Sequence, residues 1–287
     1  AKVIIGLGFR IHRGLLRGIE EGTYFAGYPA MGYANINDVY APMVLRTVGN
    51  LLEDSGYEAV LYQNTSVRLG CGVGKAVAPD MPKPDVFLHF RIAAVICGMG
   101  EIGYSKLLLS PRFGPRQRLA FIITDAPLEP DPIYDGPPLC DRCMLCVKEC
   151  PANAISATNT VKVTIAGREF EWGEIDATKC AAVYQAGTPE YSPFMPDDVA
   201  RVISSIIGAT PQDANSEALT SYTGDIWSYL RNNMPYIRNA WESYHHPAAI
   251  CGGRGCIRAC MIHLEREGKI TNQFKSPFRK RKPWRLS

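Results

Sequence analysis

The most specific pattern in the chain is the segment Cys140-Asp141-Arg142-Cys143-Met144-Leu145-Cys146-Val147-Lys148-Glu149-Cys150-Pro151. Its spacing is the bacterial ferredoxin pattern, in which three thiolates wrap one iron–sulfur cubane and the fourth cysteine ligates another cluster. A structural zinc site is the weaker alternative, because zinc sites usually separate two ligand pairs by a longer spacer. Disulfides are weaker still, because closely spaced cysteine pairs favour metal or redox use. The segment therefore predicts [4Fe-4S] clusters.

A second cysteine pattern lies near the end of the chain, where Gly252, Gly253 and Gly255 surround Cys251-x4-Cys256-x3-Cys260. Glycines there allow backbone amides to approach cluster sulfurs. Adding Cys180 gives eight cysteines, the number that two four-cysteine clusters need. We expect the first cluster to use Cys140, Cys143, Cys146 and Cys260, and the second to use Cys150, Cys180, Cys251 and Cys256. The two other cysteines, Cys71 and Cys97, are interpreted as small packing residues.

Composition excludes several classes of protein. The chain has 287 residues, is 46% hydrophobic and 21% charged, and has a net charge of +3, so disorder and a miniature disulfide scaffold are poor interpretations. The balanced charge gives little reason to invoke nucleic acid. No apolar run approaches the roughly 18 residues of a membrane span. We expect a cytoplasmic protein, with export by a removed signal left open because the sequence begins at Ala1 without Met.

Residues 1–135 alternate strand-like and helix-like segments, which predicts an α/β or α+β domain. The expected strands are 3–7, 58–62 and 119–124, and the expected helices are 39–55 and 90–97. A proline-rich strap over 126–138 cannot be helical and leads into a second domain over 136–287. In that domain we expect a hairpin over 161–172 that turns at Ala166-Gly167, and helices over 197–207 and 217–230.

Residues upstream of the ferredoxin pattern add a family resemblance. Three segments, Gly98–Tyr104, Leu107–Leu119 and Thr124–Asp131, run directly into the cysteine motif. This succession, close over roughly residues 90–155, resembles the shared core of the reductive dehalogenases and epoxyqueuosine reductases. The chain departs from both in its Cys251-x4-Cys256 spacing and in having Met261 where those families have Pro.

The resemblance implies a nitroreductase-like sandwich domain that holds a corrinoid (cobalamin), followed by a ferredoxin-like domain with two [4Fe-4S] clusters. It implies an oxidoreductase that relays low-potential electrons to the corrinoid for reduction of a small organic substrate. The implied electron donor is a ferredoxin or flavodoxin, which the basic tail Arg279–Lys282 can attract. Transfer RNA is a partner only if the chain acts like an epoxyqueuosine reductase. The alternative is a dicluster electron-transfer protein without corrinoid, and a third interpretation treats the clusters as folding staples.

Reductive chemistry of this kind needs a proton donor, for which the candidates are Tyr104, Tyr40 and Asp85. Each of the two tyrosines has a structural interpretation as a half-buried aromatic. Arg116 and Arg118 are candidates for contact with an anionic cofactor or substrate group, with a salt bridge to the strap as the alternative. His89 is interpreted as structural. Gly98 and Gly100 are cofactor-contact candidates whose spacing formally matches a dinucleotide fingerprint, although a helix-like segment precedes them.

Overall fold

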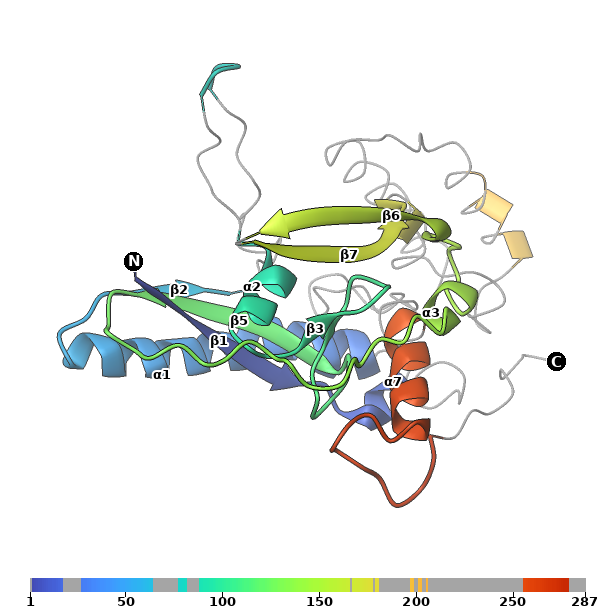
Figure 1. Ribbon diagram of the computed structural model, residues 1–287, viewed down its shortest axis with the longest axis horizontal. Helices are drawn as coiled ribbons and strands as arrows, with labels where there is room; N and C mark the ends of the chain where they lie inside the picture. The colour runs from blue at the N-terminus through green and yellow to red at the C-terminus, as the bar shows by residue number, and fades with distance from the viewer. Residues whose placement is uncertain are drawn as a thin grey trace.

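The computed structural model describes residues 2–17, 27–63, 77–81, 88–165, 167–177, 179–180, 197–198, 201–202, 205 and 255–278 (Figure 1). Within them, the central sheet has three strands in the order β1 (Val3–Arg10), β5 (Gln117–Thr124) and β2 (Ala59–Tyr62). Both outer strands run antiparallel to β5. The middle position of β5 explains its continuous apolar sequence, because both of its faces are covered.

The two faces of β5 pack against different layers, as the alternation of side chains along a strand requires. Ala120 and Ile122 belong to a core that includes Leu45 of α1 (Ala41–Asp54). Phe121 packs on the opposite side in a core with α2 (Phe90–Ile96). The predicted helices over 39–55 and 90–97 are thus confirmed. Two π-helical turns precede α1, namely η3 (Tyr28–Ala34) and η4 (Ile36–Tyr40).

A long hairpin covers the second face of the sheet, with α2 between them (Figure 1). It consists of β6 (Ile155–Ile165) and β7 (Arg168–Ile175), which turn at Gly167. The hairpin expected over 161–172 is confirmed in its turn, but it begins six residues earlier than the alternation indicated. Phe170 and Trp172 point into the core, with 6% and 4% of their surfaces exposed.

A short hairpin joins the sheet to the cysteine loop. It pairs β3 (Glu101–Ile102) with β4 (Leu108–Leu109), and Gly100 stands directly before it. Gly100 has a φ of 146°, and a Cβ atom there would lie 1.9 Å from the carbonyl oxygen of Leu109. Only glycine fits this close approach of two backbone segments. The position of β3, and hence of Glu101, depends on it.

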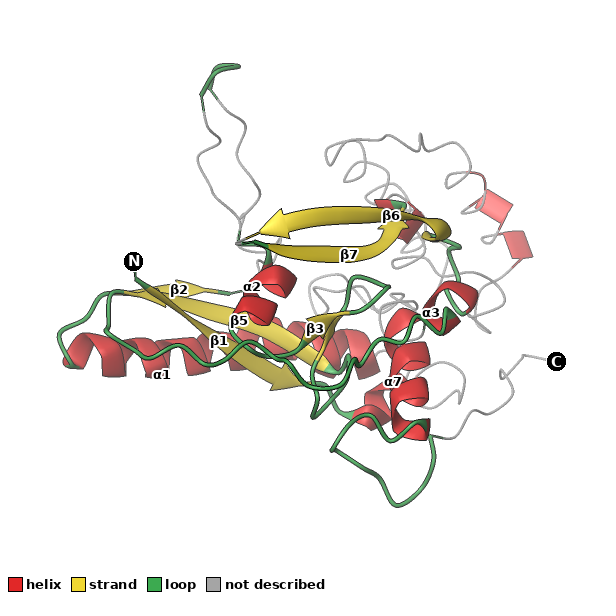
Figure 2. Cartoon of the chain, in the orientation of Figure 1, coloured by secondary structure: helices red, strands yellow, loops and turns green. Residues whose placement is uncertain are grey.

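The cysteine-bearing helices lie side by side at one end of the molecule (Figure 2). They are α3 (Leu145–Lys148) and α7 (Cys256–Arg266). Ile257 and Met261 of α7 join the same core as Phe9 of β1. A single hydrophobic core therefore links residues from both sides of the predicted domain boundary at 135/136, and the boundary itself stays a prediction.

A buried ion pair ties α7 to the N-terminal segment. Arg13 lies in the 3-10 turn η1 (Arg13–Leu16). Its Nε–H is shared between the two carboxylate oxygens of Glu265, at 3.0 and 3.1 Å, and its Nη2 donates to Oε2 at 2.6 Å. The Arg13 guanidinium also lies 4.2 Å from the ring centroid of Phe274. The residues after α7 are thereby fixed across the N-terminal segment.

The mixed helix and strand content of the prediction is confirmed, whereas the nitroreductase-like detail stays a prediction. Several expectations concern residues outside those described. These are Asp85, Cys71, Cys251 with Gly252 and Gly253, the basic tail at 279–282, the helix over 217–230 and most of the helix over 197–207.

Candidate metal centre

Four of the predicted ligands line one small cavity between the cysteine loop and α7. We call them the first thiol group: Cys140, Cys143, Cys146 and Cys260. Burial, followed by the neighbouring Cys140 and Cys143, raises the pKa of Cys146 to about 11. The pKa of Cys260 is raised by the same causes. Thiols this close oppose each other's ionisation, so a cation among them stabilises all four thiolates.

A second set of cysteines gathers around Cys256, at the start of α7. The second thiol group comprises Cys150, Cys180 and Cys256, and its predicted fourth member, Cys251, is outside the described residues. Burial raises the pKa of Cys256 to about 12, with Cys180 and Cys150 as the next causes. Cys180 follows β7 in a helical turn, in which its N–H donates to the Asp176 carbonyl at 3.0 Å.

Helix α7 places one thiol in each group. Cys256 and Cys260 are four residues apart, so they lie on the same helix face about one turn from each other. Cys150 likewise leaves the sequence motif to join Cys180 and Cys256. Among the described cysteines, Cys260 thus lies with the cysteines of the motif, and Cys150 lies with Cys180 and Cys256. Their role as ligands, and the place of Cys251, stay predictions.

The backbone of the cysteine loop fits a cluster. Arg142 and Met144, between successive cysteines, have φ values of 55° and 61° in the left-handed region. The Tyr104 N–H donates to Cys140 Sγ at 3.3 Å, and the Ala154 N–H donates to Cys150 Sγ at 3.4 Å. Amide hydrogen bonds of this kind tune iron–sulfur clusters. Four cysteine sulfurs with amide donors around them are the donor set of an [4Fe-4S] cluster, and the residues present fit that group.

An ion-pair network borders the first thiol group. His263 Nε2 and Lys269 Nζ lie 2.8 and 3.0 Å from Asp141 Oδ2. Although partial burial acts in the opposite direction, hydrogen bonds from His263 and Lys269 hold the pKa of Asp141 at about 2. Asp141, Cys143 and His263 have ligand atoms within 4.8 Å of one another, as a mononuclear metal site would require. Because Asp141 and His263 already satisfy each other, we assign this trio to the surroundings of the thiol group.

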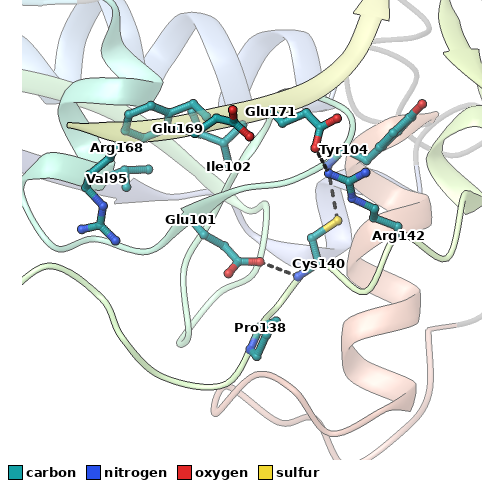
Figure 3. Close-up of a pocket in the computed structure, with 11 residues that line it drawn as sticks. Val95, Glu101, Ile102, Tyr104, Pro138, Cys140, Arg142, Arg168, Glu169 and Glu171 are labelled. Carbon is teal, nitrogen blue, oxygen red and sulfur yellow. Dashed lines mark hydrogen bonds and ion pairs between the residues drawn. The ribbon is translucent and has the colours of Figure 1, made fainter. Parts of the chain in front are cut away.

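A pocket of about 250 Å³ lies beside Cys140, beneath the β6–β7 hairpin (Figure 3). Glu101 extends from β3 and accepts a hydrogen bond from the Cys140 N–H at 2.5 Å. An ion pair between Arg142 and Glu171 joins the cysteine loop to β7. Sequence reasoning missed Glu101, because no local pattern connects it with a cysteine 39 residues away.

The proton-donor candidates do not gather at one place. Tyr104 is 6% exposed, its N–H faces Cys140, and its hydroxyl donates to the Ser156 carbonyl at 2.9 Å. Tyr40 is 54% exposed and packs edge-on against Phe9. The structural interpretation of both aromatics thus has direct contacts to support it, and their catalytic role stays a prediction.

The residues expected to contact a cofactor also lie in different environments. Arg116 is 1% exposed and donates to the Ile11 carbonyl and to Asn272, so it holds the segment after α7. The guanidinium carbon of Arg118 instead lies 3.7 Å from the Tyr33 ring centroid, and its Nε–H donates a hydrogen bond to Asn37 Oδ1. Gly98 has a φ of 75° and lies against the Pro132 carbonyl of the strap. Close backbone packing explains Gly98 and Gly100 without a cofactor.

Two other expectations concern His89 and Cys97. His89 is the N-cap of α2, and its Nδ1 accepts a hydrogen bond from the Ile92 N–H at 3.2 Å. Cys97 is half-buried with its thiol toward the Ile4 carbonyl at 3.6 Å. Both positions agree with the structural roles expected for them.

A family model described as a 4Fe-4S binding domain matches residues 136–156. Tetrachloroethene reductive dehalogenase from Desulfitobacterium hafniense is 42% identical over 72 residues, which are 24% of this chain and 13% of that protein. The enzyme of the same name from Sulfurospirillum multivorans is 40% identical over 65 residues, or 22% and 13% of the two chains. The matched segments thus span only 13% of the length of these relatives.

Two solved structures align with the chain at low sequence identity. A catabolic reductive dehalogenase aligns with a TM-score of 0.46 and 17% identity, covering 99% of this chain and 35% of the other. An epoxyqueuosine reductase aligns with a TM-score of 0.39 and 14% identity, covering 92% and 65%. Within the described parts of the chain, every helix is too short or too polar to cross a bilayer. The sequence resemblance to the reductive dehalogenases is confirmed by the shared segment.

Proposed function

We propose that the chain is an iron–sulfur oxidoreductase in which two [4Fe-4S] clusters relay low-potential electrons to a corrinoid that reduces a small organic substrate. The observation that supports this most is the pair of thiol groups on α7, with Cys256 in one and Cys260 in the other. Two clusters held one helical turn apart suit stepwise electron relay. The shared segment with the tetrachloroethene reductive dehalogenases supports a reductive activity of their type.

In this proposal Cys140, Cys143, Cys146 and Cys260 hold the first cluster. The second is held by Cys150, Cys180 and Cys256, with Cys251 as its fourth ligand. The amides of Tyr104 and Ala154 stabilise thiolate charge through their hydrogen bonds to sulfur. When bound, the clusters supply one-electron transfer at low potential and the corrinoid supplies the two-electron reductant.

The first thiol group is the proposed entry point for electrons. Cys143 is its exposed member, and Arg142 beside it has 54% of its side chain in solvent. The donor that we propose to dock beside this exposed thiol is a ferredoxin or flavodoxin. Burial and then Arg118 lower the pKa of Arg91 on α2, while Cys256 and Cys180 of the second thiol group act in the opposite direction, so the second group lies nearer to Arg91 than the first does. We therefore place substrate and corrinoid on the side of Arg91.

One observation favours the alternative function, a dicluster electron-transfer protein without corrinoid. The Tyr104 hydroxyl is engaged by the Ser156 carbonyl, and Tyr40 is exposed elsewhere, so the described residues do not assemble the expected proton donors. A cobalt-free protein that serves a partner enzyme would not need such a donor.

Anaerobic purification followed by reconstitution with hydroxocobalamin tests the two functions. We expect about eight iron per chain, from four in each cluster, and about one cobalt after desalting. About eight iron with no cobalt and no corrinoid absorbance would reject the corrinoid and favour the alternative. Clusters that dithionite does not reduce would reject both and leave them as folding staples.

A further inference from the structure

Three arginine side chains surround the ring of Phe113, in the turn that follows β4. The guanidinium carbons of Arg10, Arg112 and Arg116 lie 5.5, 5.1 and 6.0 Å from the centroid of this ring. Arg10, at the end of β1, and Arg112 are exposed, whereas Arg116 is buried. A guanidinium is attracted to the face of an aromatic ring, so the ring holds the two exposed charges close together.

A second ring, that of Phe274, continues this array. The guanidinium carbons of Arg13 and Arg116 lie 4.2 and 5.3 Å from its centroid. Phe274 is 42% exposed, so it adds apolar area to the surface. A cavity of about 260 Å³ opens beside it, with Pro277 and Phe278 in its wall. Apolar side chains that enter such cavities anchor many protein interfaces.

Positive charge is in excess on this surface. Among the residues that the structure describes, no carboxylate forms an ion pair with Arg10, Arg112 or Arg116. Arg13 is neutralised by Glu265. Charges of one sign held around one ring repel one another, and an acidic partner offsets that repulsion. We call the exposed part of the array the arginine surface, which consists of Arg10, Arg112, Phe113 and Phe274.

A single layer of side chains separates the arginine surface from the first thiol group. Gly114 follows Phe113, and a Cβ atom at Gly114 would lie 3.0 Å from Cδ1 of Leu264. Leu264 in turn lines the small cavity of the first thiol group and packs beside Cys260. A partner on the arginine surface is therefore close to that group.

The segment after α7 connects the cysteine loop with the arginine surface. Lys269 Nζ donates to Asp141 of the cysteine loop at 3.0 Å, and the Asn272 N–H donates to the Arg112 carbonyl at 3.0 Å. Lys269 and Asn272 are three residues apart, so at most about 11 Å of chain separates these two contacts. A protein seated on the arginine surface thus also reaches the edge where Cys143 is exposed.

We propose that the arginine surface docks an acidic one-electron carrier protein, of the ferredoxin or flavodoxin kind, that reduces the first cluster. This inference rests on the function proposed above, because it concerns the donor to that cluster. One electron passes from the reduced carrier to the oxidised cluster, and no bond is made or broken. Carboxylates of the carrier pair with Arg10 and Arg112, and an apolar side chain of the carrier enters the cavity beside Phe274.

The test is isothermal titration calorimetry of the anaerobically purified protein with two oxidised probes, an acidic [4Fe-4S] ferredoxin and a flavodoxin. Because the probes are oxidised, binding is measured without electron transfer. We expect at least one of them to bind, with an affinity that falls as salt is raised. Arg10→Glu and Arg112→Glu should each weaken this binding about tenfold or more. Both side chains are exposed, so the urea midpoints should stay at the wild-type value.

The matched control is Arg46→Glu, which makes the same charge reversal at an exposed position of α1 and should keep the wild-type affinity. Binding of neither probe would overturn the docking surface, as would equal affinities of Arg112→Glu and Arg46→Glu. Reduction by dithionite separates this inference from the proposed function. Clusters that dithionite reduces, in a protein that binds neither probe, keep the function and reject the surface. A probe that binds a protein whose clusters dithionite does not reduce keeps the surface and rejects the relay.

Discussion

The carboxylate of Glu101 accepts a hydrogen bond from the backbone N–H of Cys140, with the two atoms 2.5 Å apart. This bond fixes the start of the cysteine loop to β3, and β3 itself is placed by Gly100. On the same hairpin, the backbone N–H of Tyr104 also faces the loop and donates a hydrogen bond to the Cys140 sulfur. One short hairpin thus positions both the backbone and the thiol of Cys140.

Glu101→Gln tests this positioning. The substitution replaces a charge-assisted acceptor by a neutral one, so we expect faster loss of iron to a chelator from the first thiol group. Removal of a negative charge beside Cys140 should also raise the reduction potential of the cluster held there. Both are measured on anaerobic protein, by iron release to a chelator and by an EPR-monitored redox titration. Glu129→Gln, in the exposed strap, should change neither quantity; equal behaviour of the two variants would contradict the role of Glu101.

Glu265→Gln tests the anchoring of α7. The Arg13 and Glu265 side chains are 8% and 12% exposed, and removing one partner leaves the other charge buried. We expect a loss of about 3 kcal/mol in the free energy of unfolding, seen as a lower urea midpoint under anaerobic conditions. Glu169→Gln breaks an exposed pair with Lys162 and should cost less than 1 kcal/mol. Similar midpoints for the two variants would show that α7 does not depend on the buried pair.

His89 should contribute to the pH dependence of stability. Partial burial of the imidazole, followed by the charge of Lys106, lowers the pKa of His89 below the ordinary 6.5. The folded protein therefore binds fewer protons at this position than the unfolded chain does. Stability is therefore expected to fall as pH falls through 6.5. His89→Asn keeps an N-cap acceptor and does not titrate, so its unfolding midpoint should vary less between pH 7.5 and pH 5.5. The same dependence in both proteins would reject this contribution.

The sequence predicted the parts of the site that local spacing determines. The ferredoxin pattern indicates the Cys140 motif and the crossing of Cys150, whereas the pairing of Cys260 with the first group is an assignment that goes beyond that pattern. The structure groups the described cysteines in this way, and their assignment as ligands stays a prediction. The turn at Gly167 and the buried run in β5 were also readable from periodicity. Glu101 was not, because its role arises from a contact between distant segments.

Two candidate residues whose roles stay predictions show contacts that the sequence did not indicate. Arg116 was a candidate for cofactor contact, but tertiary packing buries it against Ile11 and Asn272. Tyr104 was a candidate proton donor by its place in the sequence, and the fold turns its hydroxyl to Ser156. In each case one sequence position is compatible with two environments, and only the packing of remote elements selects between them.

The central claim, that two separate thiol groups each hold one cluster, is tested most directly by EPR of the dithionite-reduced cysteine variants. Cys146→Ala and Cys260→Ala should lose the same signal and retain the same remaining one. Cys150→Ala and Cys180→Ala should lose the other signal, while Cys97→Ala keeps both. If Cys150→Ala instead gave the spectrum of Cys146→Ala, the cysteines of the sequence motif would share one cluster, and the arrangement proposed here would be wrong.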